Sequence, residues 1–341
     1  MSKRIGIVGL GMAVTPHARG LLDLADRVEV AYAFSPSAQR RRDFADRFPF
    51  PLCDKLETIL DDPSVDAVLV LTPPNTHLDV AGRCAAAGKH VLLEKPVETT
   101  TARAGQLIGA CRRAGVTLGI VLQHRFRPAA MQLAGLLRDG ELGAIVGCSA
   151  VIRLWRPQSY YDEPGRGTLA RDGGGVLMSQ GIHTLDLMLS LAGQIAEVTG
   201  FSSTTPVHRM ETEDMVCAAA RFANGAIGTI DATTAAYPGF SERIDLTCEK
   251  GTASFAGTAL NVAFRDGRVI EARPDGSAGG TGADPMAFPP DYHRAVIADF
   301  IDAIASGRPP KVTGDEALEV HRLIDALIET GRSGKPAVVA V

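Results

Sequence analysis

The chain opens with a short apolar segment that runs straight into a glycine-containing turn. Arg4–Val8 has the composition of a buried strand, and Gly9 and Gly11 follow at once. A turn of this kind between a strand and a helix lets the backbone approach a pyrophosphate, which then lies at the helix N-terminus. Val14 stands where G-x-G-x-x-G has its third glycine. An ordinary tight turn is the alternative, but the position favours a dinucleotide site contacted by Gly9, Gly11, Met12 and Ala13.

Strand-like and helix-like segments then alternate as far as residue 122. Short apolar runs are predicted as strands at Val28–Phe34, Asp66–Leu71, Val91–Leu93 and Val116–Val121, with helical segments between them. This alternation predicts a doubly wound parallel sheet. We therefore assign residues 1–122 to an NAD(P)-binding Rossmann domain.

The end of the second strand bears on the choice of cofactor. An NAD site usually has Asp or Glu there, about 20 residues after the glycines, to bind the ribose 2′-hydroxyl. This chain has Ser35, Ser37 and Arg40–Arg42 instead. Hydroxyl and guanidinium groups would accept a 2′-phosphate. We predict contacts from Ser35 and Arg40 and a preference for NADP over NAD, with a solvated basic helix start as the alternative.

The next two strand ends carry further candidate cofactor contacts. Thr72, Pro73, Asn75 and His77 follow the third strand, and Asn75 is expected to cap the next helix. The sequence leaves open whether His77 contacts the cofactor or only the backbone.

Glu94, Lys95 and Pro96 follow the apolar run Val91–Leu93. Ligands of open α/β sheets lie beyond the carboxyl ends of the strands. Pro96 fixes its own φ, and the Lys-Pro bond is a candidate for the cis form. We therefore predict that this segment aims the Lys95 ammonium at a ligand. A surface Glu-Lys pair before an ordinary turn is the alternative.

From residue 123 to 341 the pattern changes to strands joined by hairpins. Gln123 begins this part, as a further candidate cofactor contact, and Asn224-Gly225 is a strong hairpin signal. Few helical segments separate the strands, so we predict an α+β domain with a large, open, mostly antiparallel sheet. The predicted strands cover residues 145–154, 196–203, 215–222, 226–235, 244–248 and 263–270, and the glycine-rich segment Ser277–Asp284 is expected to be a loop.

A long polar segment in the second domain is the candidate substrate site, because loops of this size are usually functional. It ends in Gly173-Gly174-Gly175 and a helix on which Ser179, His183 and Asp186 share one face by their spacing. The alternative is that His183 has only a structural role as a buried core histidine. The candidate substrate contacts are Arg125, Trp155, Tyr160, Arg166, Asp172, Ser179 and His183.

Together these motifs resemble the glucose–fructose oxidoreductase / inositol dehydrogenase / rhizopine-catabolism (Gfo/Idh/MocA) family. The resemblance implies hydride transfer between NAD(P) and a secondary alcohol or ketone of a sugar, cyclitol or sugar acid. It also implies that Lys95 orients the substrate oxygen and that His183 is the acid/base. Inositol dehydrogenases have Asp four residues before that histidine, where this chain has Ser179. A non-catalytic nucleotide-sensing regulator, as in the yeast galactose repressors, is the alternative function.

Composition sets the remaining expectations. The 341 residues carry a net charge of −4 and are 45% hydrophobic, so neither a nucleic-acid partner nor a membrane partner is predicted. Since Cys53, Cys84, Cys111, Cys148, Cys217 and Cys248 form no C-x-x-C pair, we predict no metal site and a cytoplasmic location. Strands with few helices to cover them predict a homodimer or homotetramer joined through the C-terminal sheet.

Overall fold

A computed structural model describes residues 2–273 and 289–340, and these fall into two compact units. The first unit comprises residues 1–123 and 289–318, and the second comprises 124–288 and 319–341. Residues 289–318, which the sequence prediction assigned to the second domain, therefore cluster with the first. The predicted loop at 277–284 lies outside the described residues.

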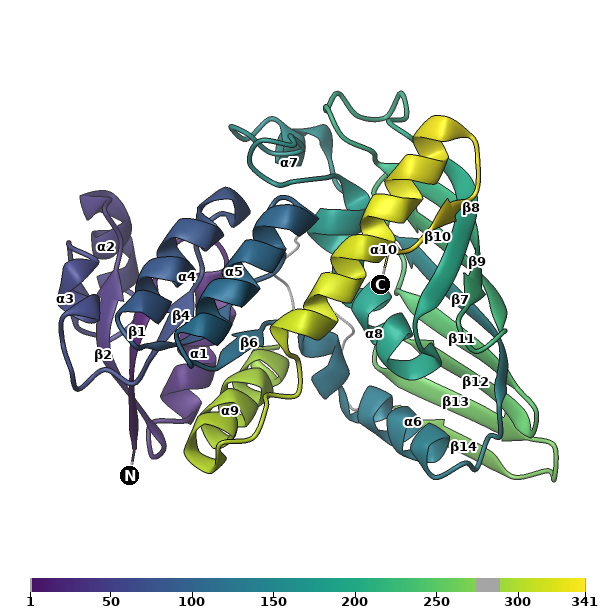
Figure 1. Ribbon diagram of the computed structural model, residues 1–341, viewed down its shortest axis with the longest axis horizontal. Coiled ribbons are helices and arrows are strands. Elements are labelled where there is room, and N and C mark those ends of the chain that lie inside the picture. Colours follow the sequence, from purple (N-terminus) through teal and green to yellow (C-terminus); the bar gives the residue numbers. More distant parts are fainter. Residues whose placement is uncertain (1, 274–288, 341) are drawn as a thin grey trace. The chain divides into compact units, whose positions relative to one another are not determined.

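The first unit is built on a parallel six-stranded sheet with the order β3-β2-β1-β4-β5-β6 (Figure 1). Its inner strands are buried on both faces, which explains their unbroken apolar runs. The chain order reverses between β1 and β4, the place where ligands of such sheets bind. The strands are β1 Lys3–Val8, β2 Val28–Phe34, β3 Leu52–Cys53, β4 Ala67–Val70, β5 His90–Leu93 and β6 Leu118–Ile120.

Helices follow most of these strands, and one further helix joins the unit from much later in the chain. Helix α9 (Asp291–Ser306) packs on α1 (Val14–Asp23). Gly20 allows this close approach, because a Cβ atom there would lie 3.1 Å from the Arg294 Cα. The other helical segments are α2 Ala38–Ala45, α3 Glu57–Leu60, η1 Pro74–Thr76, α4 His77–Ala86, α5 Thr101–Arg113 and η2 Gln123–Phe126.

The second unit is built on a nine-stranded sheet with the order β14-β13-β12-β11-β7-β10-β9-β8-β15 (Figure 1). All neighbours pair antiparallel except β7 and β10, which are parallel. The predicted fold class is thus confirmed for both units. The strands are β7 Ile145–Arg153, β8 Ile195–Ser203, β9 Met215–Phe222, β10 Ile227–Thr233, β11 Arg243–Cys248, β12 Gly251–Ala256, β13 Ala259–Phe264, β14 Val269–Ala272 and β15 Ala337–Val338.

The single strand predicted at residues 263–270 is wrong, because that stretch holds the end of β13, a turn and the start of β14. Arg268 pairs with Asp266 within the turn and with Glu141 outside it.

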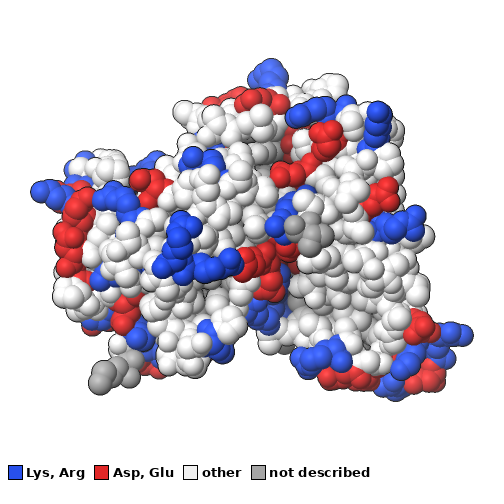
Figure 2. All heavy atoms as spheres, viewed as in Figure 1, with Lys and Arg blue, Asp and Glu red and all other residues white. Residues whose placement is uncertain are grey.

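Figure 2 shows acidic and basic side chains interspersed over the surface that it displays.

Helices cover one face of the large sheet. Helix α8 (Ile182–Ala192) packs on β7 and β11, and α6 (Pro128–Arg138) packs on α8, β12 and β13. Helix α10 (Gly314–Ser333) crosses from the first unit into the second after Leu318. Its Thr330 hydroxyl accepts a hydrogen bond from the Gly200 amide in β8. Across the described ranges, no helix is both long and apolar enough to cross a membrane.

Candidate active site

The glycine turn lies against the exit of β4. Gly9 has φ +106°, and a Cβ atom there would lie 2.8 Å from the Leu71 carbonyl carbon and 2.9 Å from the Thr72 nitrogen. Only glycine satisfies both the dihedral angle and the contact. A Cβ on Gly11, by contrast, would meet nothing within 4 Å. The turn is thus closely packed on one side and open on the other.

Helix α1 begins beside this open side without a side-chain cap. Its N-cap residue is Ala13, which offers no hydrogen-bonding side chain, and no acidic residue occupies its first turn. Met12 is 46% exposed. Uncapped amides and the positive end of the helix dipole suit an anion. These features fit the pyrophosphate of a dinucleotide.

The exit of β2 holds the residues predicted to choose the cofactor. Ser35 is buried, and its Oγ accepts from the Ser37 amide at 3.3 Å. Ser37 caps α2 by accepting from the Arg40 amide, and the Arg40 side chain is exposed. Arg41 donates to the Ser35 carbonyl at 2.6 Å. Thus Arg41, which was not among the predicted cofactor contacts, is also held at this strand end.

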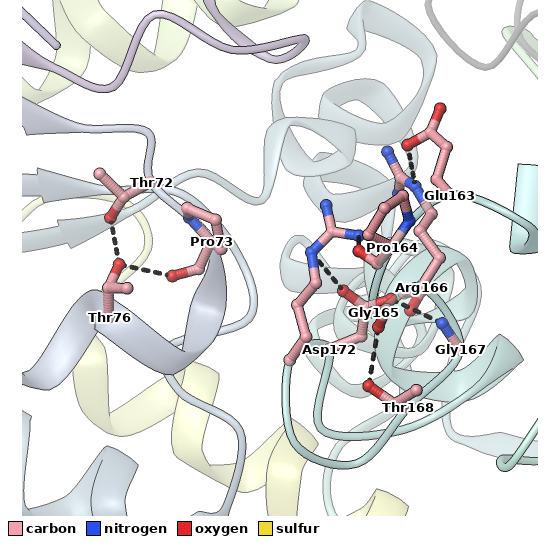
Figure 3. A network of polar contacts seen from close by, with 12 residues as sticks. Thr72, Pro73, Thr76, Glu163, Pro164, Gly165, Arg166, Gly167, Thr168 and Asp172 are labelled. Carbon is pink, nitrogen blue, oxygen red and sulfur yellow. Dashed lines mark hydrogen bonds and ion pairs between the residues drawn. The ribbon is translucent and has the colours of Figure 1, made fainter. Parts of the chain in front are cut away.

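The exit of β4 forms a compact turn (Figure 3). The Thr76 hydroxyl bonds to the Thr72 hydroxyl and to the Pro73 carbonyl, each at 2.8 Å. The capping role predicted for Asn75 is wrong: Asn75 lies inside η1, and Thr76 is the N-cap of α4.

His77 ties this turn to the segment that follows β5. Its Nε2 lies 2.8 Å from the Thr72 carbonyl oxygen, and its Nδ1 lies 3.0 Å from that of Pro96. Burial lowers the pKa of His77 despite these carbonyl contacts. Of the two alternatives for His77, the structure shows the backbone contact.

Glu94 is held by a partner that the sequence did not suggest. His17 of α1 donates from Nε2 to Glu94 Oε1 at 2.8 Å, and the Lys95 amide donates to Oε2 at 3.0 Å. The Lys95-Pro96 bond is cis, and Lys95 is partly exposed. The ring of His293 from α9 packs nearly perpendicular to that of His17, with ring centroids 4.7 Å apart. A single histidine within a helix resembles any core histidine, so no local signal identified His17 or His293.

Gln123 closes the first unit. It is 9% exposed, and its Oε1 has no hydrogen-bond partner among the described residues. An amide oxygen left in this state suits a ligand donor.

In the second unit the long polar segment folds around Tyr160 and Arg166. Arg166 lies over the Tyr160 ring, 4.3 Å from its centroid, and donates to the Tyr160 hydroxyl at 2.8 Å and to Glu163 at 2.9 Å. Asp172 accepts from the Gly167 amide (Figure 3). Trp155 packs edge-on against Tyr237. The structure therefore brings Tyr160 and Arg166 together, while Asp172 contributes to the shape of the loop.

The glycine run ends in a turn built on Glu213. This half-buried carboxylate accepts from the amides of Gly175 and Leu177. Burial raises its pKa, against the opposing effect of these amide bonds. A Cβ on Gly175 would lie 1.7 Å from the Glu213 carbonyl oxygen, so only glycine fits there.

Ser179 and His183 lie on consecutive helical segments. Ser179 belongs to a π-helical turn, η3 (Leu177–Gly181), and His183 to the first turn of α8. The Ser179 hydroxyl donates to the Gly174 carbonyl at 3.4 Å. The His183 ring packs against that of His124, with centroids 4.9 Å apart.

Asp186 makes a buried ion pair with Arg125. The guanidinium donates from Nε at 2.9 Å and from Nη2 at 2.6 Å, and Asp186 is fully buried. Such a bidentate ion pair fixes the relative orientation of the guanidinium and the carboxylate. It places Arg125 beside α8 and occupies the guanidinium edge that was predicted to hold substrate.

Comparisons with known proteins agree with this architecture. Residues 3–121 match the sequence model described as "Oxidoreductase family, NAD-binding Rossmann fold", and residues 130–254 match the GFO/IDH/MocA C-terminal domain. The chain is 29% identical to myo-inositol 2-dehydrogenase of Thermotoga maritima, over 92% of this chain and 91% of that one. It is 26% identical to D-xylose 1-dehydrogenase (NADP(+)) 2 of Haloferax volcanii, over 97% of each.

A solved structure gives the same result. The WlbA dehydrogenase of Bordetella pertussis, in complex with NADH and UDP-GlcNAcA, superposes with a TM-score of 0.85 at 28% identity, covering 100% of both chains. The glycine turn, the parallel sheet, the open second sheet and these matches together show that the chain belongs to the Gfo/Idh/MocA oxidoreductase family.

Proposed function

We propose that the protein is an NAD(P)-dependent dehydrogenase or reductase of a secondary alcohol or ketone in a sugar, cyclitol or sugar acid. The observation that carries the proposal is the segment after β5, where Glu94 and the backbone of Pro96 are held by buried imidazoles and Lys95 stays partly exposed. A lysine held at the carboxyl end of a parallel strand is placed to meet a ligand.

The first unit has the features that a dinucleotide needs. The open side of Gly11 and the uncapped start of α1 would hold the pyrophosphate. Thr72, Pro73, Pro96 and Gln123 would line the rest of the cofactor site, held in place by the buried His77 and Glu94. The bound nicotinamide supplies the hydride chemistry.

Two side chains have the chemistry for the proton and charge changes. Lys95 would stabilise the negative charge that develops on the substrate oxygen. His183 would take the hydroxyl proton in oxidation and return it in reduction, work that suits an imidazole near neutral pH. Tyr161 is a poor rival base, because its hydroxyl bonds to Thr234 and burial raises its pKa.

The finer choice of cofactor is NADP. Ser37 and Arg40 stand where an acidic residue would repel a 2′-phosphate, and Arg41 lies beside them. Fluorescence titration with NADPH and NADH tests the preference, with Arg40→Ala expected to weaken NADPH binding alone. Binding of NADH at least tenfold tighter than NADPH would overturn it.

The substrate class is tested by a panel of polyols, aldoses and acid sugars with each cofactor, followed by nicotinamide absorbance. Turnover of at least one member is expected, and Lys95→Ala should abolish most of it. Tight cofactor binding with no turnover across the panel would instead favour a nucleotide-sensing regulator. A cytoplasmic location stays a prediction from the cysteine pattern.

A further inference from the structure

A buried cluster of one carboxylate and two imidazoles closes the carboxyl end of β5. Glu94 comes from the strand end, His17 from α1 and His293 from α9, all within the first unit. The side chain of His17 is fully buried and that of Glu94 is 11% exposed. The cluster is therefore largely shielded from water, and its Glu94 directly precedes Lys95 in the chain.

Glu94 is ionised in this cluster. Burial opposes its ionisation, but the hydrogen bond from His17, followed by the electrostatic effects of the His17 ring and of Lys95, lowers the pKa of Glu94 to about 2. A carboxylate oxygen only accepts hydrogen bonds, so Nε2 of His17 carries the proton that it shares. One carboxylate thus joins the His17 ring to the Lys95 amide.

Two further histidines, His293 and His77, lie near Glu94. Burial, and then the charge of His17, lowers the pKa of His293 to about 3, so this ring is neutral near pH 7 and acts as a packing partner. The charge of Glu94 acts to raise the pKa of His77 in α4, against the larger effect of burial, and His77 also contacts the Pro96 carbonyl. Each neighbour of Lys95 in the chain is therefore held by a histidine, Glu94 through its carboxylate and Pro96 through its carbonyl.

The same cluster has the composition of a metal site, since its three ligand atoms lie within 4.8 Å of one another. Two observations favour a hydrogen-bonded cluster instead. The 2.8 Å contact between His17 and Glu94 is a direct hydrogen bond. His17 Nδ1 has no partner within the described part of the chain, whereas metal-bound imidazoles almost always donate from the second nitrogen.

We propose that His17 is a positioning residue for Lys95, a role that rests on the proposed function. By donating to Oε1 it keeps Glu94 ionised and turns Oε2 toward the Lys95 amide. Without that donor, burial would favour protonation of Glu94. Lys95 would then lose both a fixed amide partner and the neighbouring negative charge.

Two substitutions separate the hydrogen bond from simple packing. In His17→Gln the side-chain amide falls near the Nε2 position and can still donate to Glu94. In His17→Asn it falls near the Nδ1 position and is too short to reach. His90→Leu is the matched control at the opposite end of β5, where the ring accepts from the Thr117 amide.

We expect His17→Asn to lower kcat on the order of 10²-fold, the scale of a small misplacement of a reacting group. The KM for cofactor should change little. An acid limb from Glu94 should appear in the kcat profile near neutral pH. His17→Gln should restore kcat to within a few fold, and the His17→Asn/Glu94→Gln double variant should lack the limb. His90→Leu should lower the melting temperature without creating a limb.

A second measurement needs no substrate. The carboxylic-acid carbonyl band of Glu94 in infrared difference spectra, assigned with Glu94→Gln, should be absent from the wild type at pH 5 to 7 and present in His17→Asn. If the wild type turns over no substrate, the proposed function fails, and this band alone decides whether His17 keeps Glu94 ionised. An unchanged kcat profile, or no band in His17→Asn, would overturn the positioning role. If His17→Asn does not fold, His17→Leu takes its place.

Discussion

At the scale of single residues, Lys95 carries most of the proposed chemistry. Lys95→Ala should lower kcat/KM by a factor on the order of 10²–10⁴, because it removes a positioned charge from the developing alkoxide. Cofactor affinity, measured by fluorescence titration, should stay nearly intact.

Lys89 offers a matched control for this substitution. Its ammonium is buried and donates to the carbonyls of Asp62 and Val65. Lys89→Met should therefore lower the melting temperature while leaving the kcat/KM of the folded protein close to wild type. Unchanged turnover in Lys95→Ala would remove Lys95 from the mechanism.

His183 is the second residue whose role has a distinct kinetic signature. His183→Ala should abolish the ionisation seen in the kcat/KM profile for oxidation. Ser179→Asp should move that limb to higher pH, because a nearby carboxylate stabilises the protonated imidazole. A limb that survives in His183→Ala would mean that another group is the base.

Of the residues around Lys95, the sequence identifies Lys95 itself but neither His17 nor His293. The sequence identifies Lys95 because it follows a predicted parallel strand, and ligands bind at the carboxyl ends of such strands. His17 and His293 were missed because their meaning comes from each other and from Glu94. These three come from elements far apart in the chain, and their meeting depends on the packing of α9 on α1.

At the scale of elements, the turn before η3 determines where α8 begins. Gly175→Ala should destabilise the protein strongly, because the added Cβ would collide with the Glu213 carbonyl, which is fixed backbone. Gly82→Ala is the control: it lies within α4, its Cβ would meet nothing within 4 Å, and it should stabilise by about 1 kcal/mol. Thermal unfolding of both variants tests this, and equal melting temperatures would contradict it.

The sequence predicted most elements whose residues alternate or run apolar, such as β9 and the inner strands of the parallel sheet. Strand prediction failed where a segment consists mainly of small residues, because these show no clear alternation of apolar and polar side chains. Strand β12, Gly251–Ala256, is made largely of Gly, Ala, Ser and Thr and was not predicted. The π-helical turn at η3 depends on the Glu213 contacts, which helical spacing does not encode.

At the scale of the whole molecule, we propose that the open face of the nine-stranded sheet joins two copies of the chain. Phe201 on β8 is 78% exposed and Ile227 on β10 is 63% exposed. The register places Cys217 beside Phe201 and Arg221 beside Ile227, so these side chains share the face opposite α8. The face also carries ion pairs such as Arg153–Asp231 and Arg221–Glu197, and exposed apolar side chains among them are suited to association.

Light scattering at micromolar concentration should therefore give a dimer or a tetramer. Phe201→Glu should shift the mass toward the monomer, because association would bury the new charge. Val207→Glu, at an exposed apolar residue of a loop in the same unit, should leave the mass unchanged. A wild-type monomer would contradict the proposal.

The central claim is that this protein moves a hydride between a nicotinamide and a sugar-like carbinol. The direct test supplies the oxidised cofactor with polyols and sugars deuterated at their carbinol carbons and measures deuterium in the reduced cofactor by mass spectrometry. We predict that the wild type transfers deuterium from at least one substrate and that Lys95→Ala transfers far less. A protein that binds the cofactor but transfers no deuterium from any member of the panel would contradict the claim.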